Sequence, residues 1–164
     1  MKVVKERTIE GNTYFIRAFP AFAAANLAGE LASLITPAIG SVISLLGGKS
    51  ESDNLFDMDA EKAAPLLADA LSRFDGDTVE RMIKKLLIKQ GNISVQQPTD
   101  TEAQLLTEEL ADELFCGDVM NMFVLAYEVI QANFPDIFRK VQNLFGNRAE
   151  DLREMLPTLA NTEL

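Results

Sequence analysis

The segment FPAFAAANLAGELASLITPAIGSVISLLGG, Phe19 to Gly48, carries one charged side chain, Glu30. Apolar side chains avoid water, so this segment either crosses a membrane, lies in the core of a folded domain, or is covered by another chain. Three features disfavour the membrane. Glu30 sits in mid-segment, Ala and Gly are frequent where Leu and Ile favour insertion, and the cationic flanks are limited to Arg17 and Lys49.

The two prolines of this segment predict where its helices begin. Pro20 suits the first position of a helix that runs to about Ile35, and Pro37 favours a second start after Thr36. The second helix is predicted to end at Leu46, before a pair of glycines. Each helix is then too short to span a bilayer, and the small residues permit close helix packing.

The N-terminus has the pattern of a β-hairpin. Val3–Ile9 and Thr13–Phe19 are rich in β-branched and aromatic residues, and the Gly11-Asn12 pair between them is a short-loop turn signal. An isolated hairpin is marginal in water, so we expect it to pack on helices.

The rest of the chain is mainly helical in pattern. Helices are predicted over 60–73, 77–90, 107–115, 119–132 and 137–145, and a short third strand over 92–97. The helix after residue 77 has the clearest signals, since Asp77 and Glu80 have the spacing of a capping box. Its apolar stripe comprises Val79, Met82, Ile83, Leu86 and Leu87. The helix Val119–Ala132, capped by Asp118, is apolar almost all round and belongs at the centre of a bundle.

These elements predict a mainly α fold of the α+β class, in which an N-terminal hairpin packs on a bundle of about five to six helices. Residues 1–146 form a single domain that includes the hairpin at 3–19, and residues 147–164 form an acidic, partly flexible tail. A chain of 164 residues is long enough for one substantial core.

Charge and composition exclude several classes of function. The net charge of −10 argues against nucleic-acid binding, which needs a cationic surface. The sequence contains no histidine and one cysteine, which removes Ser-His and Cys-His nucleophiles and disulfides within the chain. No secretory signal is evident, because mixed charges precede the apolar segment, so we expect a cytoplasmic protein. Because the sequence has no histidine and no other catalytic signature, we expect that it is not an enzyme.

Four motifs with chemical potential have simpler structural explanations. Gly47–Ser50 (GGKS) lacks the first glycine of a phosphate loop, and Asp57–Glu61 lacks the glycine and glutamate of a calcium loop. The carboxylates between Glu108 and Glu113 are expected to form a solvated helix face rather than a metal site. Cys116 has no His or Lys neighbour in sequence and is predicted to be a buried, inert thiol. We therefore expect no catalytic, cofactor or metal site.

Several segments together resemble the tail assembly chaperones of long-tailed phages and prophages. They are the hairpin with YFIRAFPAF, the segment ending TPAIGSVISLLGG, the helix FDGDTVERMIKKLL, and the late apolar helix running into VIQANFPDIF. The resemblance covers about residues 3–145 and is strongest at Tyr14–Pro20 and at Asn133-Phe134, followed by Ile137-Phe138. In the family these positions are structural, so no catalytic residue carries over. The acidic extension beyond Gly146 departs from the family's pattern.

The resemblance implies a chaperone of the host bacterial cytoplasm that is absent from the mature virion. Its partner would be the apolar, helical tape measure protein, with the tail tube protein as a further partner, and some members have a longer, frameshifted form. Alternatives are a structural tail or adaptor protein retained in the particle, or a small phage membrane protein that uses residues 19–46. A homo-oligomer would also cover spare apolar surface. The residues predicted to bind the partner are Phe19, Phe22, Leu27, Leu31, Ile39, Ile43 and Leu46.

Overall fold

The structure is a computed structural model that describes residues 2–45 and 59–135, without the side chains of residues 34–45, 66 and 70. Several predicted features lie outside the described residues: Leu46, the GGKS motif at 47–50, residues 57–58 of the calcium-like segment, the helix at 137–145 and the tail at 147–164.

The strands form one antiparallel sheet in the order β1-β2-β3-β4. The predicted hairpin is confirmed as β1 (Val3–Ile9) and β2 (Asn12–Arg17). The predicted third strand is β3 (Ile93–Gln96), which pairs with β2, and β4 (Gln104–Leu105) adds a short edge that the sequence did not indicate. The protein is therefore a mixed α+β fold with a four-stranded sheet, where a hairpin and one short further strand were predicted.

The hairpin turn lies one residue earlier than the Gly11-Asn12 pair that predicted it. Ile9 pairs with Asn12, so the loop consists of Glu10 and Gly11. Both residues have positive φ, 48° and 81°, as a two-residue turn requires when it follows the twist of its strands. Gly11 accepts this conformation at no steric cost, and it fixes the hairpin register.

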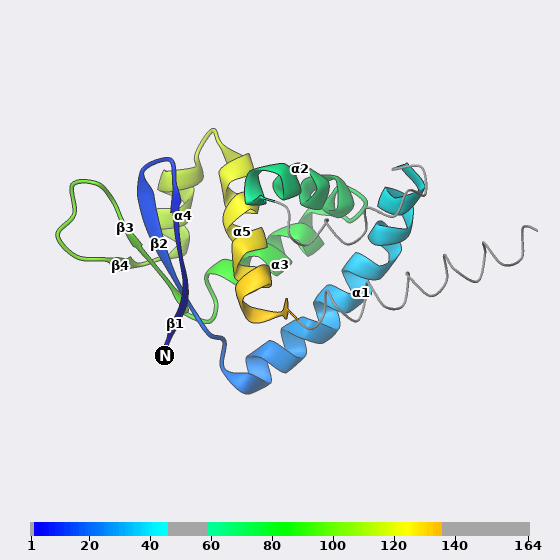
Figure 1. Cartoon of the computed structure of the whole chain (residues 1–164), viewed down its shortest axis with the longest axis horizontal. Helices are drawn as coiled ribbons and strands as arrows, with labels where there is room; N and C mark the ends of the chain where they lie inside the picture. The colour runs from blue at the N-terminus through cyan, green and yellow to red at the C-terminus, as the bar shows by residue number, and fades with distance from the viewer. Residues whose placement is uncertain (1, 46–58, 136–164) are drawn as a thin grey trace, which may run out of the picture.

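Five helices occupy the described residues, and the sheet lies at one end of them (Figure 1). They are α1 (Ala21–Leu45), α2 (Ala60–Leu71), α3 (Gly76–Leu87), α4 (Glu108–Phe115) and α5 (Val119–Asn133). The prediction of a helix break at Pro37 is wrong, because α1 is one helix of 25 residues. An internal proline costs about 3 kcal/mol, because it removes one backbone hydrogen bond, yet the helix is kept on both sides of Pro37. The helix α2 likewise continues through Pro65.

The predicted break at Pro37 was one of the features that disfavoured a membrane-spanning segment. Although α1 is longer than predicted, no helix within residues 2–45 and 59–135 combines the length and the apolar character needed to cross a membrane.

Side-chain caps fix the starts of three helices. Thr107 and Asp118 cap α4 and α5 by accepting hydrogen bonds from the amides of Leu110 and Asn121. The start of α3 was predicted two residues too late. Its cap is Asp75, which accepts a hydrogen bond of 2.9 Å from the amide of Thr78. The Asp75 carboxylate satisfies an amide that Asp77, already inside the first turn, cannot reach.

The core forms around α5, which contacts β1, α2, α3 and α4 (Figure 1). Its residues from Val124 to Ile130 are all buried, as the all-round apolar pattern predicted. The helix α3 buries four of the five residues of its predicted stripe, and Val79 is half-buried. The helix-facing side of the sheet adds Tyr14, Ile16, Ile93 and Val95.

Candidate functional site

The seven residues predicted to bind a partner occupy different environments. Phe22 is 93% exposed at the start of α1. Three others belong to the buried core: Phe19, Leu27 and Leu31. The remaining three have side chains outside the described residues: Ile39, Ile43 and Leu46. Among the described members of the set, Phe22 alone offers a largely exposed apolar side chain, and the assignment of the set to a partner stays a prediction.

The two sequence segments with the strongest resemblance meet in space. The amide of Phe19 donates a hydrogen bond of 2.9 Å to Oδ1 of Asn133, and Nδ2 of Asn133 donates to the carbonyl of Val129. The rings of Phe19 and Phe134 stack with centroids 5.6 Å apart. This junction fixes the passage from β2 into α1 against the end of α5.

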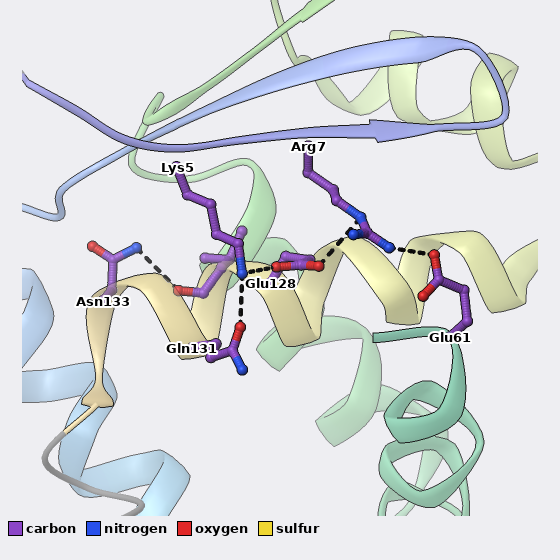
Figure 2. A network of polar contacts seen from close by, with 7 residues as sticks. Lys5, Arg7, Glu61, Glu128, Gln131 and Asn133 are labelled. Atoms are coloured by element: carbon purple, nitrogen blue, oxygen red, sulfur yellow. Dashed lines mark hydrogen bonds and ion pairs between the residues drawn. The ribbon is translucent and has the colours of Figure 1, made fainter. Parts of the chain in front are cut away.

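A second contact between the sheet and α5 is a buried charge network, which Figure 2 shows. Glu128 is on α5 with a side chain only 3% exposed, and it forms ion pairs with Lys5 and Arg7 of β1. Lys5 also donates a hydrogen bond of 2.7 Å to Gln131, and Arg7 forms an ion pair with Glu61 of α2. Lys5 and Arg7 point to the same side of β1 because successive strand residues alternate between faces.

This network holds β1 over α5 and the start of α2 (Figure 2). Glu128 is buried and matched by two cations, so its carboxylate is a structural counter-ion. The Glu61 pKa is lowered, first by the hydrogen bond from its own backbone amide at the start of α2 and then by Arg7, which keeps its carboxylate charged.

Among the described residues, a groove of about 610 Å³ is lined by α2, α3, α4 and α5. We call it the α3–α5 groove. Leu71, Ile83 and Leu87 are its buried floor. Its partly exposed apolar walls are Phe74, Val79, Ala111, Val119, Met122 and Phe123. Sequence reasoning assigned the α3 stripe and α5 wholly to the core and therefore missed this groove.

The rim of the α3–α5 groove is charged. Among the described residues that line it, the carboxylates are Glu80, Glu108 and Asp112, and the cation is Lys84. Lys84 joins two helices, since it pairs with Glu80 of α3 at 2.7 Å and with Glu108 of α4. These bonds, to Glu108 first and Glu80 second, raise the Lys84 pKa above its usual range. The rim is therefore anionic overall around an apolar floor.

One predicted environment is wrong. Cys116 is exposed, because the chain turns away from the core at the end of α4 and Gly117 follows with φ of 81°. The carboxylates at Glu108, Glu109, Asp112 and Glu113 are exposed on α4. Within the part of the chain that the structure describes, no cluster of three or more His, Cys, Asp or Glu side chains is arranged to hold a metal ion.

Comparison with known families decides the assignment. The family model described as phage tail assembly chaperone protein, TAC, matches residues 10–146. The chain belongs to this family. Searches of curated proteins and of solved structures found no match to this chain. The match includes β2, the contact of Phe19 with Asn133 and Phe134, and every lining residue of the α3–α5 groove. The resemblance inferred from the sequence is confirmed.

Proposed function

We propose that this member of the tail assembly chaperone family binds the apolar, helical tape measure protein and keeps it soluble until the tail tube assembles around it. The observation that supports the proposal is the α3–α5 groove, an open apolar surface bounded by charge in a chain of this family. The protein acts by binding alone, with no chemical step.

The physical requirements of such a chaperone agree with the composition. A holder of an aggregation-prone helix needs apolar surface that the helix can cover, together with enough charge to keep the complex dissolved. The chain has a net charge of −10, and its groove combines an apolar floor with a charged rim.

The proposal places the protein in the host bacterial cytoplasm during assembly and outside the mature virion. The tail tube protein is a further proposed partner, since it meets the tape measure protein at the next step. The alternative is a tail or adaptor protein that stays in the particle. Mass spectrometry of purified particles separates the two: the chaperone is absent, whereas an adaptor is present in fixed stoichiometry.

The binding test is co-expression of the chain with the tape measure protein of the same phage or prophage. The tape measure protein carries an affinity tag, and the eluate is analysed by size exclusion and mass spectrometry. A stable complex of the two proteins is expected. Elution of the tape measure protein without this chain would contradict the proposal.

A further inference from the structure

We propose that the α3–α5 groove is the docking site for one helix of the client, which inserts its apolar face and places Lys or Arg side chains against the acidic rim. This inference rests on the proposed chaperone function and adds to it the site and the chemistry of the client segment. It differs from the set predicted from sequence, whose described members lie on α1 or, in the case of Phe19, two residues before it.

The walls of the groove have the geometry that accepts a helix. On α3, Val79, Ile83 and Leu87 form a row at i, i+4 and i+8, and on α5 Val119 and Phe123 are also four residues apart. A third helix packs its ridge between two such rows. At 1.5 Å per residue, the α3 row extends about 12 Å, which corresponds to about two turns of a client helix.

The exposure of the walls leaves room for such a helix. Val119 is 53% exposed and Val79, Met122 and Phe123 are half-buried, whereas Leu87 beneath them is 1% exposed. A partner helix covers the walls without displacing the floor.

The charge of the rim selects the kind of helix. Lys84 engages Glu80 and Glu108, and within the described residues Asp112 has no cationic partner. An apolar helix that carries Lys or Arg beside its apolar face therefore complements the rim, while an acidic one is repelled. Charge repulsion also disfavours a second copy of this chain that docks groove to groove, because the two anionic rims would meet.

Within the part of the chain whose side chains the structure describes, the other exposed apolar residues are scattered over different elements. Phe22 is at the start of α1, while Val4 and Leu105 are on β1 and β4, the two edges of the sheet. None of them lines the α3–α5 groove. They provide controls for the test.

The test measures the affinity of labelled helical fragments of the tape measure protein by fluorescence anisotropy. Val119→Glu puts a charge into the wall, at the first residue of α5, where an acid is favourable to the helix dipole and should leave the fold intact. Its matched control is Met120→Glu, since Met120 is 41% exposed on the same turn but does not line the groove. Leu105→Glu, at 51% exposed, is the distant control.

A second pair of variants tests the rim. Asp112→Lys reverses the charge at the groove, and Glu113→Lys makes the same change next to it, at an exposed position outside the lining. Both changes place a cation in the C-terminal half of α4, so their effects on the helix are similar.

We expect Val119→Glu to weaken binding about tenfold, because a charge in the apolar wall loses water when the client docks. We expect Asp112→Lys to weaken binding severalfold, more at low salt than at high salt. The three controls should bind like the original chain. Equal affinity for all variants would overturn the groove assignment while the chaperone function stands. A further control, Phe22→Glu at the start of α1, should also bind normally, and loss of binding on this variant alone would overturn the assignment too. A shift of Val119→Glu from oligomer to monomer without client would assign the groove to a second copy and also overturn it.

If the original chain binds no fragment and no intact tape measure protein, the proposed function itself fails. That result is distinct from the failure of the site, which requires the original chain to bind. Thermal denaturation of every variant confirms that the fold is retained. With these measurements, each outcome either supports the docking site or excludes it.

Discussion

Substitution of Glu128 by Gln tests whether the network at β1 holds the sheet onto the helices. The change keeps the shape of the side chain and removes its negative charge. Lys5 and Arg7 then lose their shared counter-ion, although Lys5 keeps Gln131 and Arg7 keeps Glu61. Glu128→Gln is therefore expected to destabilise the protein.

The magnitude follows from burial. Breaking a fully buried ion pair by removing one partner costs about 3–5 kcal/mol. Here the carboxylate is 3% exposed but both cations are 31% exposed, so water can solvate them in part. The amide oxygen of Gln also accepts one of the lost hydrogen bonds. We expect a loss of about 1–3 kcal/mol in the free energy of unfolding.

The assay is urea denaturation followed by far-UV circular dichroism at pH 7. The midpoint should fall with little change in the slope, because the surface exposed on unfolding is unchanged. In thermal melts, a domain of about 150 residues loses about 2–4 °C for each kcal/mol. Glu102→Gln, at an exposed position in the segment between β3 and β4, is the control and should leave the midpoint unchanged.

A triple variant refines the interpretation. Replacing Lys5, Arg7 and Glu128 together by Met removes all three charges, and buried ion pairs are often replaced by apolar groups at no cost. The triple variant should therefore be more stable than Glu128→Gln alone. If Glu128→Gln matches the original stability within about 0.5 kcal/mol, the network does not hold the sheet and the reasoning is refuted.

Three further predictions concern single side chains. Asn133→Ala should cost about 1–3 kcal/mol in urea denaturation, because the Phe19 amide loses its acceptor; an unchanged midpoint would contradict this. Leu31→Asp buries an unpaired charge at a position that is 3% exposed, so it should destabilise the protein strongly. Phe22→Asp, at a position that is 93% exposed, should change the free energy of unfolding by less than about 0.5 kcal/mol. Equal melting temperatures for the two variants would count against this placement of α1. Burial raises the pKa of Tyr14 to about 12, above its value of about 10 in the unfolded chain. The neutral phenol therefore favours the folded state fully below about pH 10, and this stabilisation is lost as the pH rises towards 12. Tyr14→Phe should lose less stability over this range, and identical profiles for the two proteins would exclude that role.

The features that the sequence predicted correctly depend on local patterns. Alternating β-branched residues on either side of Gly11 indicated the hairpin, and the spacing of the α3 stripe indicated its buried face. The unbroken apolar pattern of α5 indicated its central position. These signals are contained within one element and need no knowledge of its neighbours.

The features that were missed depend on contacts between distant segments. The strand β4 has two exposed residues and exists because β3 pairs with it. The pairing of Lys5 with Glu128 joins residues more than a hundred positions apart, and neither has a local pattern that reports it. Phe22 fitted the apolar period of α1 but faces outward, since the period alone does not say which side of a helix meets the core.

The α3–α5 groove illustrates the same limit at the site. The residues Val79, Ile83 and Leu87 were correctly placed on one face of α3, but four helices must come together before that face becomes the side of a groove. The presence of apolar residues in a stripe did not reveal that Val119 and Phe123 would be left partly uncovered. Partner-binding residues were therefore sought on α1, where the apolar segment is longest.

The proposed function requires that this chain hold the tape measure protein in solution. The most direct measurement is the soluble fraction of that protein when it is expressed alone, with this chain, and with the Val119→Glu variant. We expect an insoluble client alone, a soluble complex with the original chain, and a largely insoluble client with the variant. A tape measure protein that is equally insoluble with and without the original chain would contradict the claim.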